Sequence, residues 1–374
     1  MKILFVCGSV EPGKDGVGDY TKLLATEFEN MGAEAVVVAV NEAESSQDYS
    51  EVFQRINGMD LKTYRMSGKL PWKHRIEKLR EILISYTPDL VSLQFVPFSF
   101  QKKGLPFFLP RSLSSLKEHC KNWHVMFHEL WVADSHAGSV KELVLRELQK
   151  FIIRRLLKMV KFRHIATSNP FYASMLARIG YNAAVMPIFS NLPKGKASSL
   201  ELISNREQKI VGLFFGHVHY HEQMVEKISQ LARQIRERMG KGLVIGHVGN
   251  NQNYVTRNFF SELASVSEVE VLTFGFLDAN DAADVFAGAD IGLSNYPLHL
   301  IGKSGSIASL LYNGLPVVLL DENWEWQHPD VSYLRPIGRI ECIDAFINQD
   351  RNFADIYSPA SAARKFAGLF SGEK

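Results

Sequence analysis

The chain has 374 residues, which is too long for one ordinary hydrophobic core and suits two domains of roughly 150–200 residues each. Hydrophobic residues make up 46% and charged residues 22%, a balance that is typical of a folded globular protein and excludes a disordered one. The formal net charge of +2 comes from 42 basic and 40 acidic side chains, so no overall field indicates a nucleic acid as partner.

The cysteines and the apolar stretches indicate the cellular compartment. Cys7, Cys120 and Cys342 are far apart and form neither a metal-binding nor a redox spacing, which is typical of a reducing cytoplasm. The apolar segment 1–6 is interrupted too soon by polar residues to be a secretory signal, and it predicts a buried first strand. No stretch approaches the roughly 18 apolar residues needed to span a bilayer. We expect a cytoplasmic protein that is soluble or at most peripheral to a membrane.

Short β-branched runs alternate with longer amphipathic patterns in the first half of the chain. This alternation predicts a parallel sheet covered by helices. The clearest helix is 20–31, where Leu23, Leu24 and Phe28 share one face and Gly32 supplies the stop. The predicted strands are 3–6, 35–40, 90–95, 124–127, 164–167 and 184–187.

A polar segment, 191–208, has the composition of a linker, and the alternation restarts after it. The pattern as a whole predicts an α/β protein with two doubly wound, Rossmann-like domains facing each other across a cleft. We place the first domain at 1–195, the second at 205–345, and a helical tail at 350–374 that crosses back onto the first domain. The predicted strands of the second domain are 210–215, 243–248, 270–274, 291–293 and 316–320, and its clearest helix is 223–239.

A loop after the first predicted strand ends in Gly16, Val17 and Gly18. Glycines before a helix let the backbone approach a ligand, and a helix N-terminus favours negative charge. We interpret these residues as a donor-binding or phosphate-binding loop; the alternative is that the glycines serve only the turn. The loop lacks the G-x-G-x-x-G spacing, and no acidic residue ends the predicted second strand, so a dinucleotide fingerprint is excluded.

A matching feature lies in the second half, where Lys303, Ser304, Gly305 and Ser306 precede a helix predicted over 307–313. Ser304 or Ser306 can cap that helix, and several amides and the Lys303 ammonium would then point to one spot. A cation beside a helix N-terminus is unfavourable without an anion. We therefore prefer a diphosphate site, and a solvated lysine beside an ordinary cap is the alternative.

Five segments in chain order, 16–18, 127–130, 215–217, 274–276 and 314–318, resemble those of the GT-B glycosyltransferases, and the pattern is closest to the retaining family 4. The resemblance implies transfer of a sugar from a nucleoside diphosphate sugar to a hydroxyl of a glycan, a lipid-linked acceptor or a small molecule, with retention of configuration. No D-x-D carboxylate pair stands in a suitable loop, so we expect neither a metal nor another cofactor.

The resemblance also assigns roles to single residues. His128, after the fourth strand, would contact the donor sugar, and a structural hydrogen bond is its alternative role. With Lys303 it is our candidate catalytic residue. The base would meet the backbone of Gly275, Phe276 and Leu277, and the phosphates would meet Gly216, His217, His219 and Lys303 together with Ser304, Gly305 and Ser306.

Two departures from the family pattern support other hypotheses. The positions of the paired glutamates fall on Ile301 and Ser309, and the Arg and Lys that usually follow Gly216 are absent. A catalytically degenerate GT-B protein that binds a partner or a sugar nucleotide without turnover is therefore the second hypothesis.

Three alternating histidines, His217, His219 and His221, would point one way on an extended segment and could bind Zn²⁺. A metal-dependent hydrolase is the third hypothesis. No nearby carboxylate or cysteine set completes such a site, so we prefer one or two of them as hydrogen-bond donors to phosphate.

A basic stretch, 151–164, predicts a helix packed on the core with a solvated basic side. The alternative is that this helix lies on an anionic membrane surface.

Overall fold

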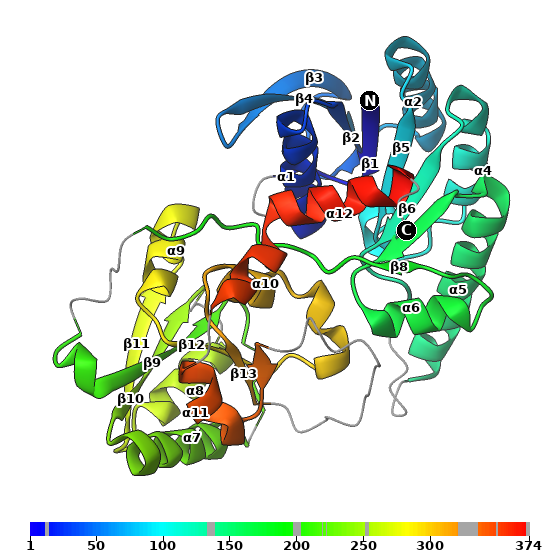
Figure 1. Cartoon of the computed structure of the whole chain (residues 1–374). Helices are drawn as coiled ribbons and strands as arrows, with labels where there is room; N and C mark the ends of the chain where they lie inside the picture. The colour runs from blue at the N-terminus through cyan, green and yellow to red at the C-terminus, as the bar shows by residue number, and fades with distance from the viewer. Residues whose placement is uncertain are drawn as a thin grey trace. The chain divides into compact units, whose positions relative to one another are not determined.

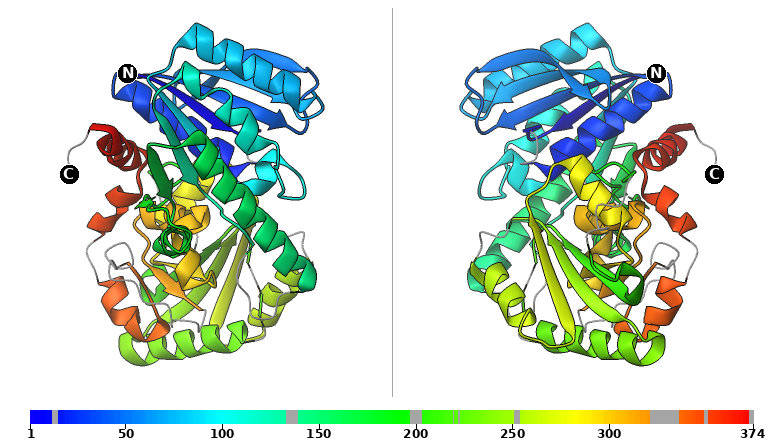
Figure 2. Two further views of the ribbon diagram at one scale, coloured as in Figure 1. Left: turned by 90° about the vertical axis from the view of Figure 1, so that its right-hand side faces the viewer. Right: turned by 90° about the vertical axis from the view of Figure 1, so that its left-hand side faces the viewer.

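The computed structural model describes residues 1–11, 15–132, 139–196, 203–218, 220–221, 223–250, 254–320, 336–348 and 351–371. The chain divides into two compact units (Figure 1). The first is Met1–Pro187 together with Ala362–Lys374, and the second is Ile188–Ser361. Each unit is built on its own, mainly parallel, sheet, and helices cover both sheets (Figure 2). The predicted fold class, α/β with two parallel-sheet domains, is confirmed.

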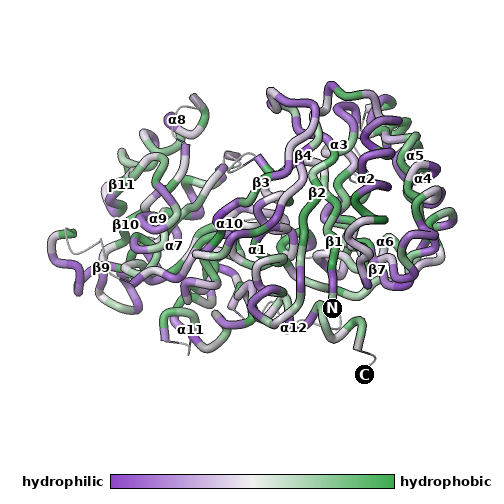
Figure 3. Tube along the Cα trace, turned by 90° about the horizontal axis from the view of Figure 1, so that it is seen from above, coloured by the Kyte–Doolittle hydropathy of each residue, from purple (hydrophilic) through white to green (hydrophobic). Residues whose placement is uncertain are grey.

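The first unit contains an 8-stranded sheet in the order β3-β4-β2-β1-β5-β6-β7-β8. All neighbours pair in parallel except β3 and β4. The central strands are buried on both faces, as parallel strands covered by helices are, and β1 and β2 are hydrophobic except at their ends (Figure 3). The bounds are β1 (Lys2–Cys7), β2 (Glu34–Glu42), β3 (Tyr49–Ile56), β4 (Met59–Ser67), β5 (Leu90–Phe95), β6 (Trp123–Phe127), β7 (His164–Thr167) and β8 (Ala184–Val185).

The antiparallel hairpin β3–β4 was not predicted. Its turn is Asn57-Gly58, and both residues have positive φ, +50° and +87°, as a two-residue hairpin turn requires. An Asn-Gly pair between two alternating segments is the sequence signal that would have found it.

Helices complete the first unit. They are α1 (Gly16–Asn30), α2 (Trp72–Tyr86), α3 (Pro97–Phe100), α4 (Leu109–Ser114), α5 (Val140–Val160), α6 (Pro170–Ala177) and, from the end of the chain, α12 (Pro359–Ser371). The predicted helical tail is α12, and its Phe366 packs on Phe28 of α1 with ring centroids 5.3 Å apart. The basic stretch lies on α5 only as far as Val160, because the helix ends there and His164 begins β7. This part of α5 buries Ile152, Ile153, Leu156 and Leu157 and exposes Arg154, Arg155 and Lys158. Among the described helices, none is both long and apolar enough to cross a membrane.

The second unit contains a 6-stranded parallel sheet in the order β11-β10-β9-β12-β13-β14. Alternate residues of β9 face opposite sides, so Val211 and Leu213 pack with α9 and α10, whereas Ile210 and Phe214 pack with α7 and α8. The bounds are β9 (Lys209–Phe215), β10 (Gly242–Val248), β11 (Val269–Gly275), β12 (Ile291–Ser294), β13 (Val317–Leu319), β14 (Ile337–Gly338), α7 (Met224–Met239), α8 (Tyr254–Leu263), α9 (Ala279–Ala287), α10 (Gly305–Tyr312) and α11 (Ile343–Ile347).

Candidate functional site

The winding of the second sheet indicates where a ligand would bind. From β9 the chain places β10 and β11 on one side, then crosses to place β12 and β13 on the other, so the direction switches between β9 and β12. Open parallel sheets bind ligands beyond the carboxyl ends of their strands at such a switch point. In this unit, the loop that follows β9 and the start of α10 lie at that point, so a ligand would be expected to bind there.

Gly216, directly after β9, lies against the first turn of α10. Its φ is +80°, and a Cβ at this position would come within 2.9 Å of the Ser306 Oγ. The Gly216 N–H donates to the Val248 carbonyl at 2.9 Å, and its own carbonyl lies 2.9 Å from Nε2 of the buried His247. Only glycine avoids both the backbone strain and the close contact at this position, and the hydrogen bonds to Val248 and His247 hold the loop in place.

The start of α10 brings the predicted Lys303–Ser306 segment together with Gly216. Ser304 is the N-cap, and its hydroxyl accepts from the Ile307 N–H at 3.3 Å. Sequence reasoning left Ser304 and Ser306 as alternative caps, and the structure selects Ser304. Lys303 ends the preceding 3₁₀ helix (Leu298–Lys303), and the whole segment is half-buried.

The three histidines after β9 have different environments. His217 is exposed and His221 is half-buried, whereas His219 lies outside the described residues. Among the residues that the structure describes, no group of three or more His, Cys, Asp and Glu side chains is arranged to hold a metal ion.

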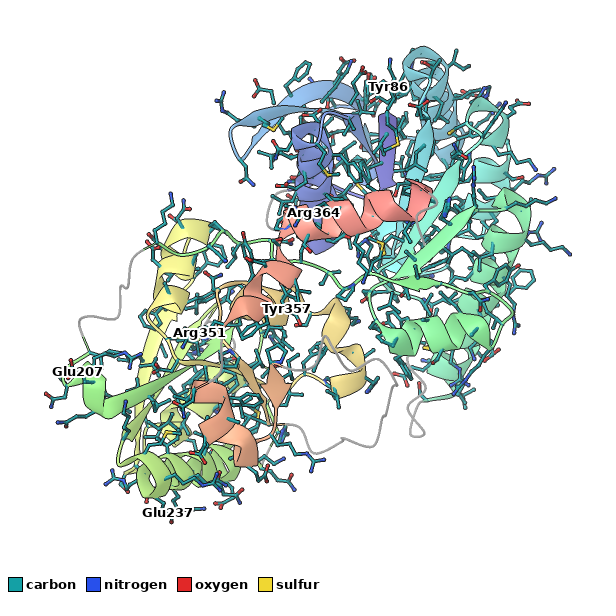
Figure 4. All side chains as sticks on the ribbon, in the orientation of Figure 1. Tyr86, Glu207, Glu237, Arg351, Tyr357 and Arg364 are labelled. Atoms are coloured by element: carbon teal, nitrogen blue, oxygen red, sulfur yellow. The ribbon has the colours of Figure 1, made fainter. Side chains whose placement is uncertain are left out.

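The positions of the two missing glutamates are buried. Ile301 is 4% exposed and belongs to the core on the α10 side of the sheet. Ser309 is 2% exposed, and its Oγ lies 3.1 Å from the Ser190 Oγ. The Ser190 N–H in turn donates to the carbonyl of Tyr357 at 3.1 Å; Tyr357 is labelled in Figure 4. In place of two ligand-binding carboxylates, the 3₁₀ helix before α10 contributes an apolar core contact through Ile301, and α10 contributes the hydroxyl pair of Ser309 with Ser190.

The predicted base-binding residues lie two strands from β9, on the side away from β12. Gly275 ends β11, and its carbonyl accepts from the Gly249 N–H at 2.9 Å. Phe276 is 87% exposed, whereas Leu277 packs partly against the core. Phe276 is the most exposed of the large hydrophobic side chains that the structure describes, and other aromatic residues such as Tyr254, at 70%, are also exposed.

In the first unit, the backbone N–H groups that follow the loop after β1 are already hydrogen-bonded to a side chain of that loop. Asp15 caps α1, and its carboxylate accepts from the N–H groups of Val17 at 2.9 Å and Gly18 at 3.0 Å. A Cβ on Gly18 would lie 2.3 Å from the Ser9 carbonyl oxygen, whereas a Cβ on Gly16 would have nothing within 4 Å. A carboxylate already occupies the two amides and repels anions, which counts against the phosphate role predicted for Val17 and Gly18. Gly18 lies in the first turn of α1, and its missing side chain lets the helix start pack closely against Ser9 and Val10.

One statement about this loop was wrong. An acidic residue does end the second strand, because β2 extends to Glu42. Glu42 is fully buried, accepts from the Ser9 hydroxyl at 2.7 Å and the Val10 N–H at 3.0 Å, and pairs with Arg65 at 3.2 Å. Its carboxylate anchors the loop after β1 and is not available to a ribose.

His128 follows β6 and is 6% exposed. Its Nε2 lies 2.8 Å from the Oε1 of Gln94 on β5, and the ring of Tyr20 on α1 contacts it edge-on with centroids 4.8 Å apart. Burial lowers the pKa of His128 to about 3, so the imidazole is neutral at pH 7. Sequence reasoning missed Gln94. The signal was Ser92 and Gln94, two polar residues on one face of an otherwise apolar strand.

Comparisons with solved structures show the fold. The chain is similar to sucrose-phosphate synthase from Thermosynechococcus elongatus, with 12% identity, a TM-score of 0.60 and coverage of 99% of this chain and 98% of that one. It is also similar to UDP-GlcNAc 2-epimerase from Neisseria meningitidis bound to UDP-GlcNAc, with 14% identity, a TM-score of 0.55 and full coverage of both chains, 100% and 100%.

A third similar structure is the catalytic domain of starch synthase IV from Arabidopsis thaliana bound to ADP and acarbose, with 10% identity, a TM-score of 0.56 and coverage of 99% and 98%. At these identities the similarity shows a shared fold, the GT-B architecture of two parallel-sheet domains. No family model and no curated protein matches the sequence.

Proposed function

We propose that this protein is a glycosyltransferase that moves a sugar from a nucleoside diphosphate sugar to an acceptor hydroxyl, with retention of anomeric configuration. The observation that carries the proposal is the contact between Gly216 and Ser306 at the switch point of the second sheet. There the amides at the start of α10 and the Lys303 ammonium would stabilise the diphosphate as it departs, without a metal ion.

The other predicted residues have roles in the same proposal. His217, and His219 beside it, would donate hydrogen bonds to the phosphates in place of the usual arginine and lysine. The exposed Phe276 and the backbone of Gly275 and Leu277 would meet the base. Neutral His128 would contact a hydroxyl of the sugar, and the acceptor would be a glycan, a lipid-linked molecule or a small molecule.

Similar proteins support a nucleotide-sugar ligand and suggest its range. The epimerase structure holds UDP-GlcNAc and the starch synthase structure holds ADP and acarbose. We therefore propose a uridine or adenosine diphosphate sugar as the first candidate donor. An epimerase with this fold would bind the same donor but would change the sugar without transferring it.

The test begins with thermal melting of the purified chain against UDP, ADP, GDP and their common sugar derivatives, because a ligand that binds the folded state raises the melting temperature. The donor that stabilises the protein is then incubated with acceptor pools, and release of nucleoside diphosphate is measured. Transfer predicts release that depends on the acceptor. A changed sugar that is still attached to the nucleotide would indicate an epimerase and contradict the proposal.

A second candidate, a GT-B protein that binds a sugar nucleotide without turnover, is favoured by one observation. The side chains at both glutamate positions, Ile301 and Ser309, are buried and make contacts within the protein. Binding without any release of nucleoside diphosphate, across all acceptor pools, is the outcome that this candidate predicts.

A further inference from the structure

A chain of hydrogen bonds leads from His128 into the core of the first unit. The Nε2 of His128 lies 2.8 Å from Gln94 Oε1, Gln94 Nε2 donates to the Ser92 hydroxyl at 2.8 Å, and that hydroxyl lies 2.9 Å from His124 Nδ1. Gln94, Ser92 and His124 are all fully buried. The chain joins β5 to β6 side by side in the sheet.

The direction of the amide determines where the protons are. Because Gln94 presents its carbonyl oxygen to His128, the Nε2 of His128 must carry the proton in this bond. The Ser92 hydroxyl accepts from Gln94 and still has its own hydrogen and a second lone pair for the contact with His124 Nδ1, so the direction of that last bond depends on the tautomer of His124. The other ring nitrogen of His124, Nε2, has no hydrogen-bond partner within the described structure.

The far end of the chain is closed by aromatic rings. The His124 ring meets Phe366 and Phe370 of α12 edge-on, with centroids 4.6 Å and 5.7 Å apart. Both contacts are T-shaped, so the chain of hydrogen bonds ends at His124 against apolar rings of α12.

We propose that Gln94 is a positioning residue that holds His128 in its Nε2-protonated tautomer, so that His128 accepts a hydrogen bond from a sugar hydroxyl through Nδ1. This inference rests on the proposed function for the identity of the ligand, but the tautomer itself does not. A neutral imidazole has one donor and one acceptor, and Gln94 occupies the donor. The ligand group that matches the remaining nitrogen is a hydroxyl, not a carbonyl or a phosphate oxygen.

The surroundings of His128 keep the imidazole neutral. The titratable groups near it include Tyr20 from α1, His124 from β6 and Glu129, the next residue in the chain, and Gln94 is uncharged. Burial lowers the His128 pKa to about 3, so the acceptor nitrogen keeps its lone pair from pH 5 to pH 8. A cationic His128 would instead donate from both nitrogens.

The tautomer is tested on the full chain by ¹⁵N NMR with labelled histidine at pH 7, with the His128 signals assigned by His128→Gln. We expect protonation at Nε2 alone. A proton at Nδ1 would mean that the Gln94 amide is turned and the chain of bonds runs the other way, and an imidazolium would mean that the site is cationic. Either result overturns the proposal, and neither depends on a nucleotide being bound.

The role of Gln94 in catalysis is tested with Gln94→Leu and a matched control, Gln149→Leu. Gln149 is a buried glutamine of the same unit whose amide accepts from the Val132 N–H at 2.9 Å and donates to the Gly104 carbonyl at 3.2 Å. Both variants lose a buried amide. Only Gln94→Leu should mix the His128 tautomers and lower kcat, by about tenfold, the scale of one hydrogen bond. Equal kcat in the two variants at comparable melting temperatures would contradict the positioning role.

Gln94→Glu tests whether Nδ1 of His128 accepts a hydrogen bond from the ligand or donates one. A carboxylate next to Nε2–H stabilises the imidazolium and raises the His128 pKa. Activity of this variant should therefore fall as the pH decreases through the new pKa, while wild type does not show that loss. Activity that increases on protonation would overturn the acceptor assignment. Failure to bind any nucleotide would overturn the proposed function and leave the NMR result standing.

Discussion

Gly216 lies so close to Ser306 that a Cβ on the glycine would meet the serine hydroxyl at 2.9 Å. The contact joins the loop after the central strand β9 to the first turn of α10, and φ of Gly216 is +80°. A side chain at this position therefore faces both backbone strain and a steric clash. The loop and the helix start are the two segments that we propose for the diphosphate, so their separation should be sensitive to a single methyl group.

Gly216→Ala should lower both stability and nucleotide affinity. The positive φ alone destabilises a non-glycine residue by about 1–3 kcal/mol, and the clash adds to this. Gly240→Ala is the matched control, because Gly240 has a φ of +65° but nothing within 4 Å of its added Cβ. Unfolding in urea and calorimetric titration measure both effects. Adding Ser306→Gly should restore part of the affinity of Gly216→Ala, and an affinity loss in Gly240→Ala would show that strain alone is responsible.

Lys303→Ala should weaken binding of the nucleoside diphosphate by about ten- to hundredfold. This is the range for one charge-assisted hydrogen bond, about 1.5–3 kcal/mol. Lys241→Ala is a suitable control, because Lys241 directly precedes β10 at the amino edge of the same sheet. Titration of the best nucleotide into both variants gives the comparison. Equal affinity of wild type and Lys303→Ala would remove Lys303 from the phosphate site.

His128→Ala should lower turnover by about 10²-fold while the fold stays intact, the scale of losing a positioned polar group. The control is His74→Ala, at an exposed position of α2. Steady-state kinetics with the identified donor, together with circular dichroism, measures the effect. Wild-type turnover in a folded His128→Ala protein would return His128 to a structural role.

Most of the parallel strands were predictable because they are short apolar runs, whereas β4 and β14 were not predicted. β7, His164–Thr167, has the predicted bounds, and β9, Lys209–Phe215, begins one residue before its predicted start. Such strands are buried on both faces, so their hydrophobicity is visible without knowledge of their neighbours. The hairpin β3–β4 was not predicted because its strands alternate polar and apolar residues and contain no continuous apolar run.

The site was less predictable, because its contacts join distant residues. Glu42 lies beyond the predicted end of the second strand, and its contacts with Arg65, Ser9 and Val10 explain a fully buried carboxylate at the end of β2. The bond between His128 and Gln94 crosses 34 positions of the chain. By contrast, the cap of α1 by Asp15 is local and could have been found, since an aspartate stands directly before the first helical residue.

Activity should survive extensive EDTA treatment, since the proposed phosphate contacts are amides, His217 and Lys303. Release of nucleoside diphosphate is measured before and after chelation, with added Mg²⁺, Mn²⁺ or Zn²⁺ as the reciprocal experiment. Complete loss that one of these ions restores would contradict the metal-independent mechanism. A restoration specific to Zn²⁺ would favour a hydrolase that uses His217, His219 and His221.

Stability should fall below pH 6.5 because of His124 and His128. Burial lowers the pKa of each to about 3, whereas the ordinary value is 6.5. Between these two values the unfolded chain binds protons that the folded chain does not, so lowering the pH favours unfolding. Each histidine contributes up to about 1.4 kcal/mol per pH unit in this window, and the contribution is absent above pH 7.

His124→Phe removes the contribution of His124 to the pH dependence of stability and leaves that of His128. The variant is expected to be less stable than wild type at pH 7.5, because Ser92 loses its partner, but to lose roughly 2 kcal/mol less between pH 7.5 and pH 5. Urea unfolding at both values measures the difference. Phe127→Leu is the control, because Phe127 is a buried apolar residue of the same strand, three positions after His124. This variant should be destabilised equally at both pH values relative to wild type. If His124→Phe and Phe127→Leu show the same pH dependence, His124 is not held neutral by the fold.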